Sequence, residues 1–174
     1  MVREHMDQDM ENMLLHVAEQ HDWHKALMLA GSFWRFPLFV CLAPEMTRQE
    51  RREQLADIWT ACDNIWAWRE IALRYLHETG YIGDLPKPTT PLTLYRGVSS
   101  RVHRLGLSWS LSRETARKFT HPFSRGGIES SQAAIYEAVA PPEAFLAGFS
   151  DRDEQEYVVD PALLQAVRLV EAGT

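Results

Sequence analysis

The sequence is poor in cysteine and lacks a long apolar run. Its only cysteines, Cys41 and Cys62, have no C-x-x-C spacing and both stand in apolar sequence. That pattern argues against a disulfide framework or a thiolate zinc site and favours a reducing compartment. No stretch reaches the roughly 20 apolar residues that a membrane-spanning helix needs, and the acidic start MVREHMDQDMEN is unlike a signal peptide. We therefore expect a cytoplasmic protein with no membrane partner.

The chain also lacks an excess of basic residues. Its formal net charge is -6, and residues 1–90 hold nine Lys/Arg against fourteen Asp/Glu, while residues 91–174 hold nine against ten. Nucleic-acid binders usually carry a basic face, so this balance argues against tight binding driven by phosphate neutralisation. It leaves open a local basic groove.

A metal-binding motif is absent too. His16, His21 and His24 lie close together in the chain, but no H-E-x-x-H spacing accompanies them. After Asp151 and Asp153, the sixth position of a calcium loop is Glu156 instead of glycine. We expect no bound metal.

What is present is an ordinary globular composition, with 45% hydrophobic and 24% charged residues, enough for one compact domain or a domain with a helical extension. Spacings of three and four residues predict helices over 9–20, 23–30 and 47–80, the last with a Thr47/Glu50 capping box and Gly80 as its stop. The apolar run 36–43 fits either helix or strand.

The pattern changes at LPKPTTP, residues 85–91, where three prolines in seven residues cannot continue a helix. Beyond it, short alternating runs predict strands, and Ser112 is a good N-cap for one short helix. The expected strands cover residues 92–95, 107–111, 133–139 and 157–159. The sequence therefore predicts an α+β fold with an N-terminal helical segment, 1–85, and a β-rich core, 86–174.

The acidic cluster at residues 149–161 is the first candidate for chemistry. If EQEYVV enters a strand, Glu154 and Glu156 project from the same face, because side chains alternate along a strand. Paired carboxylates raise the pKa of at least one of them and are used to stabilise a cationic sugar carbon. Taken alone, the cluster is more typical of a solvated loop.

Two further elements carry polar groups on predicted strands. Arg96, followed by Gly97, stands in the run PLTLYRGVSS, where its guanidinium needs a phosphate, carboxylate or other partner. Ser108 and Ser110 alternate with Trp109 in GLSWSLS, just before the predicted helix. Each element alone is more simply explained as a structural ion pair or as turn and cap residues.

In order and spacing, the three elements together resemble the arginine–serine–glutamate class of ADP-ribosyltransferases, which includes arginine-modifying toxins. The resemblance runs from Leu94 to Pro161, and the helical lead-in also resembles that of many such toxins. The middle residue of the family's Ser-Thr-Ser is Trp109 here, a departure at a position that is not the catalytic one. The resemblance implies a two-sheet β core and NAD as co-substrate, with release of nicotinamide and transfer of ADP-ribose.

The resemblance also implies roles for individual residues. Arg96 would hold the NAD pyrophosphate or nicotinamide ribose, with Gly97 beside it, and Ser108 would orient Glu156. Glu156 would bind the ribose 2′-hydroxyl and stabilise the oxocarbenium-like transition state. Glu154 would face the acceptor, and a glutamate there is associated with an arginine side chain or a nucleobase as acceptor.

Other parts of the expected site are less specific. Trp109 and Ser110 lie on the same expected strand as Ser108 and are further candidates for contact with NAD. In the loop 121–132, Phe123 could stack on NAD and Arg125 could contact its phosphates, or both could belong to a plain surface loop. The resemblance to toxins makes an antitoxin or immunity protein a candidate partner. The sequence leaves two alternatives open, a NAD glycohydrolase that uses water as acceptor and an inactive relative that binds NAD or a protein.

Overall fold

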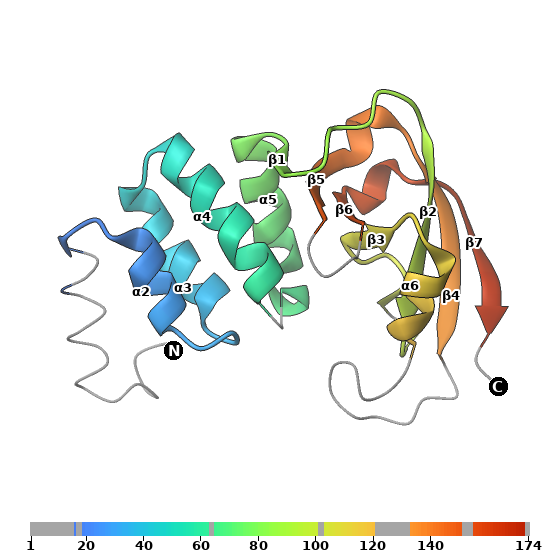
Figure 1. Ribbon diagram of the computed structural model, residues 1–174, viewed down its shortest axis with the longest axis horizontal. Helices are drawn as coiled ribbons and strands as arrows, with labels where there is room; N and C mark the ends of the chain where they lie inside the picture. The colour runs from blue at the N-terminus through green and yellow to red at the C-terminus, as the bar shows by residue number, and fades with distance from the viewer. Residues whose placement is uncertain are drawn as a thin grey trace. The chain divides into compact units, whose positions relative to one another are not determined.

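The structure is a computed structural model that describes residues 16, 19–62, 65–100, 103–120, 133–150 and 155–172. Its contacts divide the chain into two compact units, residues 1–79 and 80–174 (Figure 1). The division precedes the expected boundary at 85/86, because residues 82–83 already form a strand of the sheet. The chain is thus mixed α+β, as its sequence pattern predicts.

The first unit is helical. Its described helices are α2 (Trp23–Leu29), α3 (Arg35–Leu42), α4 (Arg48–Ala61) and α5 (Arg69–Thr79), with 3-10 turns at Ala43–Glu45 and Trp66–Trp68. The apolar run 36–43, which fitted either helix or strand by its sequence, therefore lies mostly in helix α3. The predicted helix at 9–20 lies outside the described residues apart from positions 16, 19 and 20.

The prediction of a single long helix over 47–80 is wrong, because two helices occupy that stretch. The Thr47/Glu50 capping box starts α4 as predicted, but Cys62 ends it in an extended conformation, with φ -105° and ψ 132°. Gly80 follows α5 at φ 75°, the left-handed conformation that suits a glycine stop. Apolar spacing continues across Cys62 since both helices bury a face, so periodicity alone did not reveal the break.

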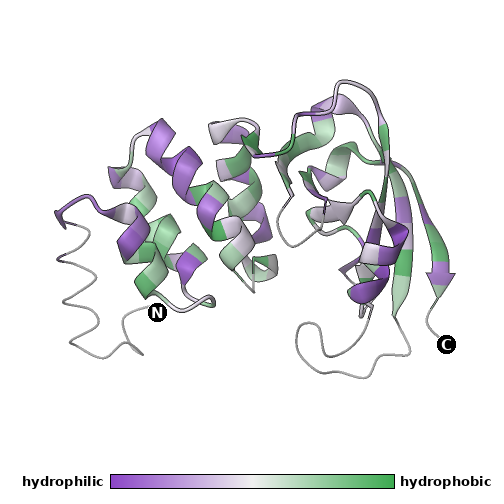
Figure 2. Cartoon of the chain, in the orientation of Figure 1, coloured by the Kyte–Doolittle hydropathy of each residue, from purple (hydrophilic) through white to green (hydrophobic). Residues whose placement is uncertain are grey.

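The helical unit has an apolar core of its own. Leu27, Phe39, Leu55, Ile58 and Leu76 are fully buried. Figure 2 shows α3 as largely hydrophobic and α4 as mainly hydrophilic. The buried residues are Phe36, Pro37 and Phe39 in α3 and Gln54, Leu55, Ile58 and Trp59 in α4. Burial of one face of each helix accounts for their stability better than intrinsic propensity does.

The second unit is a sheet with one short helix. The described strands are β1 (Ile82–Gly83), β2 (Leu92–Val98), β3 (Ser108–Ser110), β4 (Ala134–Ala140), β5 (Phe145–Phe149), β6 (Glu156–Val159) and β7 (Gln165–Ala172). They hydrogen-bond into one sheet in the order β1-β5-β6-β3-β2-β4-β7, so the expected two-sheet core is corrected to one continuous seven-stranded sheet. Strands β2, β3, β4 and β6 were predicted, whereas β1, β5 and β7 were not.

One face of this sheet carries an apolar core cluster, and Ile135 and Val158 are fully buried on the other. Leu94, Val98, Trp109, Tyr136 and Tyr157 belong to a buried cluster with Phe145 and several alanines. The helix α6 (Arg113–Lys118) follows β3 and begins at the predicted N-cap, Ser112, whose side chain accepts a hydrogen bond from the backbone N–H of Thr115. In Figure 1, α6 lies beside β2, which is consistent with its packing against that strand.

Candidate functional site

The three strands that carry the sequence motifs are neighbours in the middle of the sheet. Strand β3 pairs with β2 on one side and with β6 on the other, both antiparallel. Arg96 lies on β2, Ser108 and Ser110 on β3, and Glu156 at the first position of β6. Residues far apart in the sequence are therefore brought to adjacent strands.

Strand register defines which of these residues share a face. Tyr95 pairs with Ser110, and Ser110 pairs with Glu156. Directly opposed residues of antiparallel strands project to the same side, with Cβ atoms about 5 Å apart. Ser108 alternates with Ser110 and lies on that side too, opposite Val158. We call this side, with Ser108, Ser110 and Glu156, the serine face.

Ser110 is the serine directly across from Glu156, whereas the resemblance assigns the orienting role to Ser108. The Ser110 side chain is 6% exposed, and its Oγ accepts a hydrogen bond from the backbone N–H of Ser112 at 3.1 Å. With that lone pair engaged, the hydroxyl proton of Ser110 is available for an acceptor on the serine face. The S-x-S spacing pointed to both serines, and only the register distinguishes them.

The Arg96 side chain leaves β2 on the side of the sheet opposite the serine face. It follows Tyr95 and alternates with Leu94 and Val98, which both lie in the core cluster. Its Nε donates to the carbonyl oxygen of His103 at 3.0 Å, and its Nη1 donates to that of Ser108 at 2.5 Å. Arg96 therefore holds the main chain that leads into β3, while its expected contact with NAD stays a prediction.

Glycines permit two close approaches around these strands. A Cβ at Gly106 would overlap the Arg96 guanidinium, so the loop before β3 lies directly against that side chain. A Cβ at Gly97 would overlap the carbonyl oxygen of Ala116 in α6. Gly97, proposed from the sequence as a NAD contact, thus has a packing reason to be glycine: it lets α6 reach β2.

Trp109 has a structural role in the sheet. Its ring is 2% exposed and lies in the core cluster, and its Nε1 donates to the carbonyl oxygen of Gly106 at 2.9 Å. Burial raises the pKa of Tyr157, its register partner on β6. Both features indicate that the side of β3 and β6 opposite the serine face is apolar and closed to water.

The row that contains Tyr95, Ser110 and Glu156 extends further than the sequence indicated. Tyr95 also pairs with Glu137 on β4, and Glu137 pairs with Arg168 on β7. The Arg168 Nε donates to Glu137 Oε1 at 2.8 Å. On the other side, Glu156 pairs with Phe149 on β5. Polar or aromatic side chains thus occupy one row across six strands, a pattern that no single-strand motif could reveal.

Three expected site residues lie outside the described residues. They are Glu154, the acceptor-side carboxylate, and Phe123 and Arg125 of the loop 121–132. Their assignments stay predictions. The face shared by Glu154 and Glu156 is likewise untested, since β6 begins at Glu156.

No family model, curated protein or solved structure matches this chain. Among the described residues, no cluster of three or more His, Cys, Asp or Glu side chains could hold a metal ion. In the same part of the chain, every helix is too short or too polar to cross a membrane. The resemblance to ADP-ribosyltransferases therefore rests on the motif residues of the sequence.

Proposed function

We propose that this chain is a NAD-dependent ADP-ribosyltransferase. The observation that carries the proposal is the register of the central strands, which sets Ser110 directly across from Glu156 while Arg96 binds the main chain of Ser108. The arginine, serine and glutamate elements were singled out from sequence order alone. Ser108, Ser110 and Glu156 share one face of adjacent strands, which supports a common site for them. Arg96 projects from the other face and would act there through the main chain of Ser108.

In the proposed reaction, the bond between the ribose C1′ and the nicotinamide nitrogen breaks, and its electron pair leaves with nicotinamide. The Glu156 carboxylate stabilises the oxocarbenium-like carbon that results, and the hydroxyl of Ser110 or Ser108 orients that carboxylate. An acceptor nitrogen then forms the new bond to C1′ and loses a proton. We propose an arginine side chain or a nucleobase as the acceptor, because the resemblance associates a glutamate at position 154 with these acceptors.

The deciding experiment compares the wild-type chain with Glu156→Gln. We expect the variant to release nicotinamide from NAD at least about 10²-fold more slowly, because it loses a charge that acts mainly in the transition state. Its circular dichroism spectrum and its NAD dissociation constant should change little. Glu143→Gln is the matched control, since Glu143 is an exposed glutamate on the 3-10 turn Pro142–Ala144.

Labelling the adenine half of NAD separates transfer from hydrolysis. Label that follows protein or nucleic acid from a cell lysate identifies the acceptor, whereas free ADP-ribose indicates a glycohydrolase. Wild-type turnover in Glu156→Gln, or no nicotinamide release by the wild-type chain in any of these mixtures, would contradict the proposal.

A further inference from the structure

Helix α6 is too short to be stable without outside support. It has six residues, and isolated helices shorter than about 12 residues are marginal in water. Ser112 caps its first turn, and the close approach at Gly97 seats it on β2. A third support comes from the edge strand β7.

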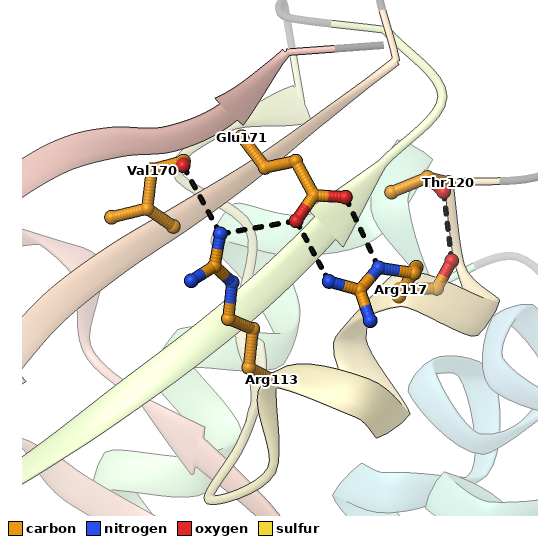
Figure 3. A network of polar contacts seen from close by, with 5 residues as sticks. All are labelled: Arg113, Arg117, Thr120, Val170 and Glu171. Carbon is orange, nitrogen blue, oxygen red and sulfur yellow. Dashed lines mark hydrogen bonds and ion pairs between the residues drawn. The ribbon is translucent and has the colours of Figure 1, made fainter.

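That support is one carboxylate shared by two arginines. Arg113 and Arg117 are one helical turn apart, so their side chains lie on the same face of α6. Arg117 donates from Nε to Glu171 Oε1 at 3.1 Å and from Nη2 to Oε2 at 2.8 Å, while Arg113 Nη2 donates to Oε2 at 3.0 Å. Figure 3 shows Glu171 between the two guanidinium groups.

We call Glu171 with Arg113 and Arg117 the Glu171 clamp. Main-chain carbonyl oxygens on both sides of this clamp also accept hydrogen bonds. Arg113 Nη2 donates to the carbonyl oxygen of Val170 at 3.2 Å. At the other end of α6, the Thr120 hydroxyl donates to the carbonyl oxygen of Arg117 at 2.7 Å. Hydrogen bonds from Arg117 and Arg113 lower the pKa of Glu171, which keeps its carboxylate charged.

The beginning of α6 is joined to the candidate site. Ser112, its N-cap, donates its backbone N–H to Ser110 Oγ, and Ser110 lies across from Glu156. The direction in which the Ser110 proton points is therefore set by where α6 begins. Glu171 in turn holds α6 at two of its residues, Arg113 and Arg117.

We propose that Glu171 is a positioning residue that acts through α6 on Ser110, and so on Glu156, in the reaction proposed above. The clamp is a surface ion-pair network, and such pairs contribute little to global stability. Its loss should therefore change the geometry at Ser110 more than it changes the stability of the fold. Small misplacements of this kind reduce the rate of the chemical step strongly.

The test is a double-mutant cycle between Glu171→Gln and Ser110→Ala, with nicotinamide release as the activity. We expect Glu171→Gln to lower kcat about tenfold, with the KM for NAD nearly unchanged and the thermal midpoint shifted by a few degrees at most. In the Ser110→Ala background it should lower kcat no further, because the residue through which it acts is gone. Multiplicative losses in the cycle would overturn the proposal.

A second readout needs no turnover. Hydrogen exchange of the Ser112 amide reports its bond to Ser110 Oγ directly. Glu171→Gln should accelerate that exchange about tenfold, whereas Glu70→Gln should not, although Glu70 likewise accepts two hydrogen bonds from one arginine, Arg69. Unchanged exchange in Glu171→Gln overturns the proposal. If the wild-type chain does not turn over NAD, the proposed function alone is contradicted. The exchange rates of the Ser112 amide then still decide whether the clamp positions Ser112.

Discussion

At the scale of single residues, polar side chains near strand ends fix the main chain around the candidate site. Arg96 gives two of its N–H groups to backbone carbonyl oxygens. Asp84, just after β1, accepts hydrogen bonds from the backbone N–H and the hydroxyl of Ser150, the residue that follows β5. The Asp84–Ser150 contact joins residues 66 positions apart, so it does not follow from the local sequence. The contacts of Arg96, with residues 7 and 12 positions away, depend on how the loop before β3 folds back.

Asp84→Asn should destabilise the fold by about 1 kcal/mol at pH 7, since an amide cannot replace both charge-assisted bonds. The side-chain and then the backbone hydrogen bond from Ser150 lower the pKa of Asp84. A folded-state pKa below the unfolded one gives stability that is complete above the unfolded pKa, near 3.9 for aspartate, and is lost as pH falls through the folded value.

Urea unfolding at pH 7 and again at about pH 2.5, below the ordinary aspartate pKa, measures this contribution. The gap between wild type and Asp84→Asn should narrow at the lower pH. Ser150→Ala, which removes only one of the two bonds, should cost less than Asp84→Asn at pH 7. A gap of equal size at both pH values would mean that the charge of Asp84 plays no part.

Residue-level chemistry was predictable where it depends on neighbours in sequence. The Thr47/Glu50 capping box and the Ser112 cap were both predicted, and both side chains form the expected hydrogen bonds. The pairing of Ser110, instead of Ser108, with Glu156 was not, because strand register depends on the whole sheet. The identity of the candidate residues thus came from sequence, and their arrangement came from the fold.

At the scale of elements, β7 shows where sequence patterns fail. Its residues QAVRLVEA favour a helix by intrinsic propensity, yet pairing with β4 makes them a strand. Register shifts interrupt that pairing twice, and Ala166 has a positive φ of 50°. Bulges of this kind, on a strand at the edge of the sheet, discourage pairing with another chain.

The caps of two helices provide a prediction at the same scale. Ser112→Ala and Thr47→Ala should each cost about 1 kcal/mol of stability, because each removes one N-cap hydrogen bond. Only Ser112→Ala should also slow nicotinamide release, since α6 begins next to Ser110. Urea unfolding together with the nicotinamide assay distinguishes the two effects. Equal activity in the two variants would show that the start of α6 has no influence on the proposed site.

At the scale of the whole molecule, the two units differ in composition as well as in fold. Every described strand and the core cluster that contains Trp109 belong to residues 80–174. This unit holds ten Lys/Arg against eleven Asp/Glu, a net charge of -1, so most of the net -6 belongs to residues 1–79. The change at LPKPTTP signalled a boundary, but its place depended on β1, a two-residue strand too short to leave a sequence pattern.

We expect residues 80–174 to fold on their own, because the sheet, its core cluster and α6 with its Glu171 clamp all lie within them. A fragment of this size exceeds the roughly 40 residues below which folding usually needs disulfides or metals. The measurement is cooperative urea unfolding, followed by circular dichroism. Because a net charge near zero promotes association, it should be repeated at several protein concentrations. A dilute fragment that unfolds without a cooperative transition would show that the sheet depends on residues 1–79, whereas a concentration-dependent loss would show association of a folded unit.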